Sequence, residues 1–132
     1  MRVFVDTSAL IALANPSDGM HASAKRCMKS LVDAALVTSD YVLDEMLTRW
    51  LTTDRAQRGF EFFDAILESP RYTLAFVDRT VFDLARQRAE AFQEHRLSFT
   101  DCTNVVLVHE MRLDGIFAFD DGFSHVGLNV LP

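Results

Sequence analysis

The chain alternates short apolar runs with longer segments in which apolar residues recur at helical spacing. Each run is too short for a helix and is bounded by turn residues, which predicts a buried strand. The predicted strands are residues 2–5, 36–38, 72–77, 116–119 and 127–131. The segments between them carry apolar residues on one helical face. The predicted helices are residues 8–14, 17–34, 41–51, 55–67, 78–94 and 100–112.

This order of elements favours an α/β fold with a short, mainly parallel sheet, because strands that alternate with helices are joined by right-handed crossovers over both faces. The sequence has no repeat or linker, so residues 1–132 are expected to form one domain. Ser98 and Asp101 have the spacing of a capping box at the start of the last helix. Gly115 is expected to end that helix.

Composition excludes several classes of protein. Hydrophobic residues make up 49% of the chain and charged residues 24%, as in ordinary globular domains. Asp6 interrupts the first apolar run and no cleavage site follows, so we expect a strand rather than a signal peptide, no membrane span, and a cytoplasmic protein. Cys27 and Cys102 lack zinc or redox spacing and are expected to be reduced and structural. The four histidines show no paired zinc-binding spacing.

Acidic residues follow two predicted strands and lie near the starts of two predicted helices. Asp6 and Asp120 come directly after the first and fourth strands, where parallel sheets bind ligands. Asp101 lies in the first turn of the last helix, and Glu45 lies one turn into the helix over residues 41–51. We therefore expect these four carboxylates to share one crevice.

Clustered carboxylates repel each other unless a cation lies between them. Mg²⁺ or Mn²⁺ prefers oxygen ligands and suits phosphodiester hydrolysis. The net charge of −6 argues against a nucleic-acid partner, and a bound divalent cation would reverse this charge locally. Thr7 and Ser8 follow the first acid, and their hydroxyls can orient a metal-bound water or phosphate.

Each of these residues also has a simpler interpretation. Asp6 can begin a turn, Glu45 can be a solvated helix residue, and Asp101 can act only as a capping acid. Asp120 can belong to a turn before Gly122. These simpler interpretations explain the placement of all four acids at related positions of one sheet only as coincidence.

Four motifs resemble those of the PIN-domain family, and within it the VapC-type toxins. The motifs are VDTSALIAL at 5–13, VLDEMLT at 42–48, LSFTDCTNVVLV at 97–108 and FAFDDGF at 117–123, and their order fits over the whole chain. By this resemblance, the family's acidic residues are Asp6, Glu45, Asp101 and Asp120, and Ser8 is the small hydroxyl residue of its first motif. Thr7 matches as well. The implied fold is a three-layer α/β/α sandwich around a short parallel sheet.

The resemblance implies a magnesium- or manganese-dependent endoribonuclease, with tRNA as a frequent substrate, that forms homodimers. It also implies a type II toxin that a small antitoxin inhibits, often by placing a basic segment in the acidic cleft. Two residues depart from the family pattern. Ala118 stands where many members have Thr or Ser, and Gly122 occupies a position that is often charged, polar or His.

Other groups have open interpretations. The arginines could line an RNA groove or form a solvated face; they are Arg49, Arg55, Arg58, Arg86, Arg88 and Arg96. Trp50 and the phenylalanines at 60, 62 and 63 could stack bases, although core packing or a dimer interface is the better interpretation. The alternative functions are a non-catalytic RNA-binding or regulatory module and a phosphohydrolase with Asp6 as nucleophile. That phosphohydrolase would need a second acid at position 8, and the serine found there disfavours this alternative.

Overall fold

The structure is a computed structural model that describes residues 1–132. Its strands are β1 (Arg2–Val5), β2 (Ala35–Ser39), β3 (Tyr72–Ala75), β4 (Gly115–Phe117) and β5 (Val130–Leu131). Its α-helices are α1 (Thr7–Ala14), α2 (His21–Ser30), α3 (Asp40–Leu51), α4 (Ala56–Glu68), α5 (Arg79–Ala91) and α6 (Phe99–Glu110). Two 3-10 helices, η1 (Gln93–His95) and η2 (Asp121–Val126), were not predicted. The order of strands and α-helices is the predicted one.

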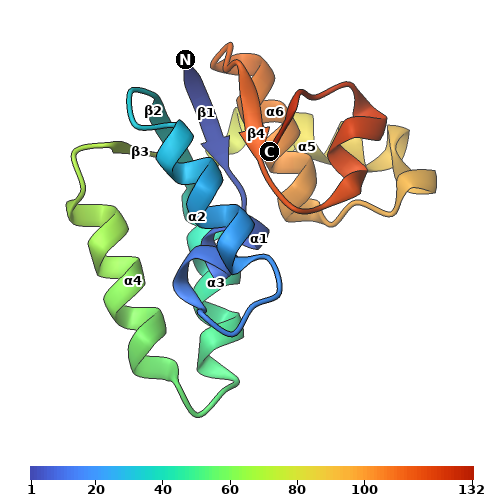
Figure 1. The fold of residues 1–132 in the computed structure, drawn as a ribbon. Helices are drawn as coiled ribbons and strands as arrows, with labels where there is room; N and C mark the ends of the chain where they lie inside the picture. Colours follow the sequence, from blue (N-terminus) through green and yellow to red (C-terminus); the bar gives the residue numbers. More distant parts are fainter.

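The five strands form one parallel sheet in the order β3-β2-β1-β4-β5. β1 is central, and Val3, Phe4 and Val5 have no exposed surface, which explains why this strand is apolar throughout. The chain moves outward from β1 to β3 and then returns to β4 on the other side of β1. Right-handed crossovers therefore place the connecting helices on opposite faces. Figure 1 shows α1 and α2 on one side of the sheet and α5 and α6 on the other, which confirms the three-layer sandwich.

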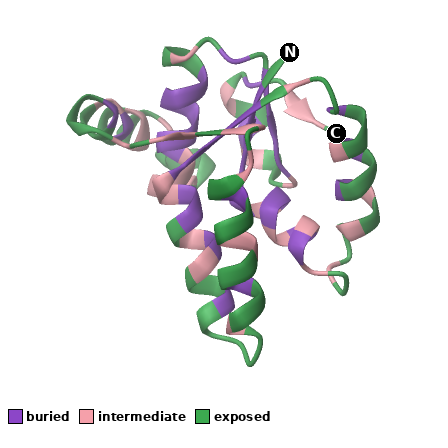
Figure 2. Cartoon of the chain, turned by 90° about the vertical axis from the view of Figure 1, so that its left-hand side faces the viewer, coloured by how far each residue is buried: buried purple, intermediate pink, exposed green.

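A single hydrophobic core lies on both faces of the sheet, and the helices cover it. Figure 2 shows buried central strands and helices whose outer faces are exposed. Helix α6 is apolar around most of its surface, and residues 102–108 are all buried. Trp50 of α3 is also buried, and Gly59 of α4 lies so close that a Cβ there would be 2.5 Å from the Trp50 Cβ. None of the helices is long and apolar enough to cross a membrane.

The helix predicted over residues 17–34 is shorter than expected. Helix α2 begins only at His21 and ends at Ser30. The preceding residues form side-chain-stabilised turns instead, since the Asn15 and Asp18 side chains accept hydrogen bonds from the backbone N–H of Ser17 and Met20. Asparagine and aspartate compete with helix formation in this way, and the apolar periodicity alone does not reveal it.

The prediction that Gly115 ends the last helix is wrong. Helix α6 ends at Glu110, and Arg112 takes the left-handed conformation with φ of 52°. Gly115 is the first residue of β4 instead. A Cβ at this position would lie 2.7 Å from the backbone oxygen of Asn129, so the glycine permits the close approach of the chain that leads into β5.

The fold brings the ends of β1 and β4 together. The chain continues from β1 to β2 on one side of β1 and from β4 to β5 on the other side. Open α/β sheets bind ligands in the crevice at such a change in strand order. The backbone N–H of Asp6 donates to the Phe117 carbonyl oxygen at 3.0 Å. The Ser8 hydroxyl in turn accepts the backbone N–H of Phe119 at 3.0 Å. The two segments that carry Asp6 and Asp120 are thus bonded to each other.

Candidate active site

Asp6 is the most enclosed acid of the site. It follows β1 directly, and its side chain caps the N-terminus of α1. Its Oδ2 accepts the Ser8 hydroxyl at 2.6 Å and the Ser8 backbone N–H at 3.1 Å. The residue is only 3% exposed, and this burial raises the pKa of Asp6 despite the Ser8 hydrogen bonds. The negative charge of Glu45 raises it further.

Asn104 holds the other oxygen of the Asp6 carboxylate. Its Nδ2 donates to the Asp6 Oδ1 at 2.8 Å, and the Asn104 side chain is completely buried. Sequence analysis missed this residue. The available signal was a polar amide directly before the apolar run at 105–108, three residues and hence about one helical turn after Asp101. Asn104 connects α6 to the end of β1 over 98 residues of chain.

Asp101 lies at the N-terminus of α6 and forms the predicted capping box. The Ser98 hydroxyl accepts the Asp101 backbone N–H, and the Asp101 carboxylate accepts the Ser98 backbone N–H, both at 3.0 Å. Partial burial raises the pKa of Asp101 to about 6, with further contributions from the charges of Asp6 and Asp120. The cap and the acidic cluster therefore share this one carboxylate.

Asp120 is exposed and belongs to the loop between β4 and η2, three residues after the strand ends. Strand β4 was predicted to extend to residue 119, but it ends at Phe117. The Asp120 Oδ1 accepts the backbone N–H of Gly122 at 2.9 Å. A Cβ at Gly122 would lie 2.7 Å from the Leu97 Cδ2 and 3.2 Å from this oxygen, so the glycine leaves room for both side chains.

Glu45 lies on α3 and is half-buried, without a hydrogen-bond partner. Its negative charge raises the pKa of Asp6, so the two carboxylates lie near enough to interact. The charges of the predicted acids thus affect one another. Glu45 raises the pKa of Asp6, and Asp6 and Asp120 raise the pKa of Asp101. No three acidic, histidine or cysteine side chains are close enough to chelate an ion by themselves.

The donor set nevertheless fits a hard divalent cation. All the donors are carboxylate oxygens, and Mg²⁺ is usually held by only one or two protein carboxylates together with waters and substrate phosphate. The desolvated, mutually repelling acids at Asp6 and Asp101 are the groups that such an ion would stabilise. The hydroxyl of Thr7 is buried without a partner, whereas that of Ser8 already bonds Asp6 and Phe119. Their predicted contact with a metal-bound water or phosphate remains a prediction.

The other predicted groups have mostly structural roles. Trp50 packs in the core, while Phe60 is 43% exposed. Arg58 donates to the Ala14 carbonyl, and Arg88 lies over the Phe92 ring. Arg86 pairs with Glu90 on the surface of α5. Both cysteines are free and buried, and their reduced, structural role stays a prediction.

The sequence profile of the PIN domain matches residues 3–129. The chain belongs to the PIN domain family. It is 31% identical to the 23S rRNA-specific endonuclease VapC20 of Mycobacterium tuberculosis over 95% of this chain and 94% of that protein. It is 30% identical to Ribonuclease VapC26 of the same species, over 89% of this chain and 86% of that protein. These relatives identify a VapC-type PIN domain.

Solved structures agree. The crystal structure of Mycobacterium tuberculosis VapC20, titled a Sarcin-Ricin loop cleaving toxin, superposes with a TM-score of 0.89 at 28% identity and covers 96% of each chain. A VapBC2 structure from Rickettsia felis has a TM-score of 0.76 at 12% identity, covers 99% of this chain and 98% of that chain, and supports the fold.

The acidic crevice of this PIN domain should destabilise the metal-free protein near neutral pH. Asp101 binds a proton more tightly when folded than when unfolded, so stability should fall as the pH rises from about 4 through about 6. Asp101→Asn removes this charge and can still accept the Ser98 N–H. We expect its Tm in EDTA to exceed that of the wild type on the order of 3 °C at about pH 7.5, and the difference to shrink at about pH 5. Equal differences at both pH values would contradict this account.

The hydrogen bond from Asn104 should stabilise the fold. Asn104→Leu keeps the number and branching of the side-chain heavy atoms but leaves the Asp6 Oδ1 buried without its donor. We expect a loss of about 1–3 kcal/mol in the free energy of unfolding, measured by urea denaturation in EDTA. Thr103→Val, a buried neighbour whose hydroxyl bonds only within α6, serves as the control and should cost less. A loss for Asn104→Leu no larger than that of the control would show that Asp6 finds another donor.

Proposed function

We propose that this chain is a magnesium- or manganese-dependent endoribonuclease. The observation that carries the proposal is the group of acids in the crevice between β1 and β4. Asp6 is buried there and feels the charge of Glu45, and Asp101 has a raised pKa beside Asp6 and Asp120. The family relationship supports it, because the two curated relatives are named as an endonuclease and a ribonuclease.

The residues that would hold the metal are Asp6 and Asp101, and Asp120 and Glu45 would act on it through its waters or through their charge. When bound, such an ion supplies a water of lowered pKa and charge stabilisation at the phosphate. The protein fixes the geometry. Ser8 and Asn104 each bond one oxygen of the Asp6 carboxylate, so this group cannot turn away from the crevice. The capping box similarly restrains Asp101.

We further propose that the substrate is a structured RNA and that the protein is the toxin of a type II toxin–antitoxin pair in the cytoplasm. The relatives that match over nearly the whole chain are VapC proteins, and VapC20 is named for 23S rRNA. The family resemblance gives tRNA as the other candidate. A small antitoxin with a basic segment would complement the acidic crevice and the net charge of −6. We propose a homodimer from the family resemblance alone.

The test is cleavage of total RNA by the purified full chain, with the products mapped by sequencing their ends. We expect cleavage at few sites with Mg²⁺ or Mn²⁺ and none in EDTA. Asp6→Asn and Asp101→Asn should each reduce the rate by about 100-fold or more, since even partners of metal ligands cost 10- to 100-fold. The mapped sites would distinguish ribosomal RNA from tRNA.

The matched control is Asp64→Asn, an exposed acid on α4 that should leave the cleavage rate unchanged. Cleavage that persists in EDTA, or that is equal in Asp6→Asn, would overturn the proposal. RNA binding without cleavage at any metal concentration would instead favour the non-catalytic RNA-binding module.

A further inference from the structure

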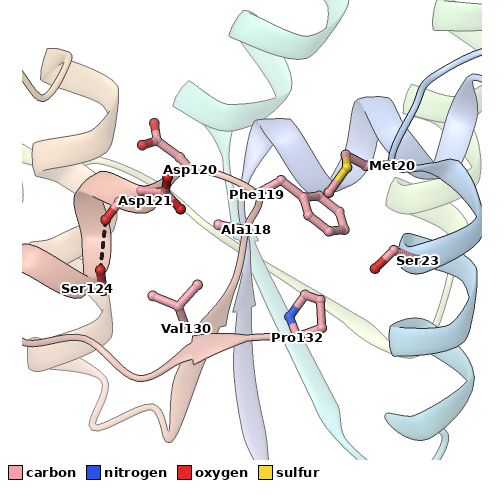
Figure 3. A pocket seen from close by; sticks show the side chains of 9 residues that line it. All are labelled: Met20, Ser23, Ala118, Phe119, Asp120, Asp121, Ser124, Val130 and Pro132. Carbon is pink, nitrogen blue, oxygen red and sulfur yellow. Dashed lines mark hydrogen bonds between the residues drawn. The ribbon is translucent and has the colours of Figure 1, made fainter.

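A pocket opens beside Asp120 that the acidic site itself does not explain. It has a volume of about 390 Å³ and lies between α2, the segment that runs from the end of β4 into η2, and the end of the chain at β5, where Val130 and Pro132 line it (Figure 3). This volume falls in the range of small-molecule sites, roughly 300–1,000 Å³. Asp120 lines the pocket and is also one of the four acids, so the pocket adjoins the proposed active site at this residue. A substrate group next to the reacting phosphate would therefore be able to enter it.

The lining of the pocket has an apolar part and a polar part. Phe119 and Met20 lie on the right of the view in Figure 3, whereas the acids of residues 120 and 121 lie on the left. The hydroxyls of Ser23 and Ser124 add polar groups, and that of Ser124 donates to the Asp121 carbonyl oxygen at 2.8 Å. A flat heterocycle has the matching chemistry, since its faces are apolar and its edges carry hydrogen-bonding groups.

The charge of the pocket decides which part of a nucleotide fits. Two carboxylates line it and no lysine or arginine does, so a phosphate group would be repelled. An uncharged base would not be. The carboxylate of Asp121 accepts hydrogen bonds only, which favours the exocyclic amino groups of adenine, cytosine or guanine over the carbonyl edge of uracil.

Phe119 is well placed to present an aromatic surface. Its ring packs edge-on against that of Phe117 at 5.8 Å between centroids, and its backbone N–H bonds the Ser8 hydroxyl that also holds Asp6. The ring is therefore fixed relative to the acids by both its side chain and its backbone. Met20 is 44% exposed on the other element of the pocket, where a flexible thioether can close over a bound ring.

We propose that this pocket binds one unstacked nucleobase of the RNA, next to the bond that is cleaved, and that it prefers a base with an exocyclic amino group. Phe119 and Met20 stack on the base, and Asp121 accepts its amino group. This inference rests on the proposed ribonuclease function, and it names the part of the site that would select the sequence at the cut.

The experiment follows the methionine methyl groups by NMR, in protein labelled with 13C at these methyls and kept in EDTA. The probes are adenosine, cytidine and uridine, with ribose as the control without a base. We expect ring currents to shift the Met20 methyl upfield with adenosine and cytidine, and less with uridine. The other methionines should not shift, and the buried Met46 reports that the fold is intact. Met20→Leu assigns the signal.

Phe119→Leu tests the stacking surface. Base stacking on one aromatic ring is strong enough that its removal should weaken the apparent affinity for adenosine by about 5-fold or more. Phe82→Leu, which removes an aromatic ring 43% exposed on α5, is the matched control and should leave the affinity unchanged. In the RNA digest, Phe119→Leu should also relax the base preference at the cleaved bond.

Absence of a Met20 shift with any nucleoside, or an equal shift with ribose, would overturn the base pocket. An equal shift and affinity for uridine would overturn the preference for amino-bearing bases. Both results are independent of catalysis, because they are measured without metal. RNA cleavage with no Met20 response would reject the base pocket and keep the nuclease proposal. A Met20 response without any cleavage would keep the base pocket and reject the nuclease proposal.

Discussion

This molecule is built around carboxylates in a partly desolvated crevice, where burial first and mutual repulsion second oppose their ionisation. Parallel pairing of β1 with β4 brings Asp6 and Asp120 to one edge of the sheet, and the start of α6 adds Asp101. Burial and neighbouring charges oppose ionisation of Asp6 and Asp101. A domain that keeps such groups together at neutral pH gives up stability locally, which is the usual condition of a functional site.

The surrounding structure opposes this repulsion with specific hydrogen bonds. Ser8 and Asn104 hold the two oxygens of Asp6, and the backbone N–H of Phe119 is bonded to the same Ser8 hydroxyl. The apolar α6 anchors Asn104 in the core, so core packing and site geometry are coupled. The same network fixes the Phe119 backbone, which connects the acids to the proposed base pocket.

Sequence patterns were sufficient for the strands, the helix order and the capping box, because these depend on local periodicity and local hydrogen bonds. They missed the local turns before α2, where Asn15 and Asp18 bond the backbone two residues further on, and they failed where a contact distant in sequence decides the outcome. Gly115 reads as a helix terminator, yet it is required by the approach of Asn129. Asn104 has no distinguishing position in the sequence of α6, and only the fold shows that it bonds Asp6. The pocket at Phe119 likewise depends on α2 lying beside the loop after β4.

The most direct test of the central claim is the position of Mn²⁺ in a crystal of the protein, located by its anomalous scattering. The account predicts an anomalous peak in the crevice with carboxylate oxygens of Asp6 and Asp101 among the ligands or bound through its waters. A crystal grown at saturating Mn²⁺ with an intact crevice and no peak there would contradict the claim that these acids are assembled to hold a metal ion.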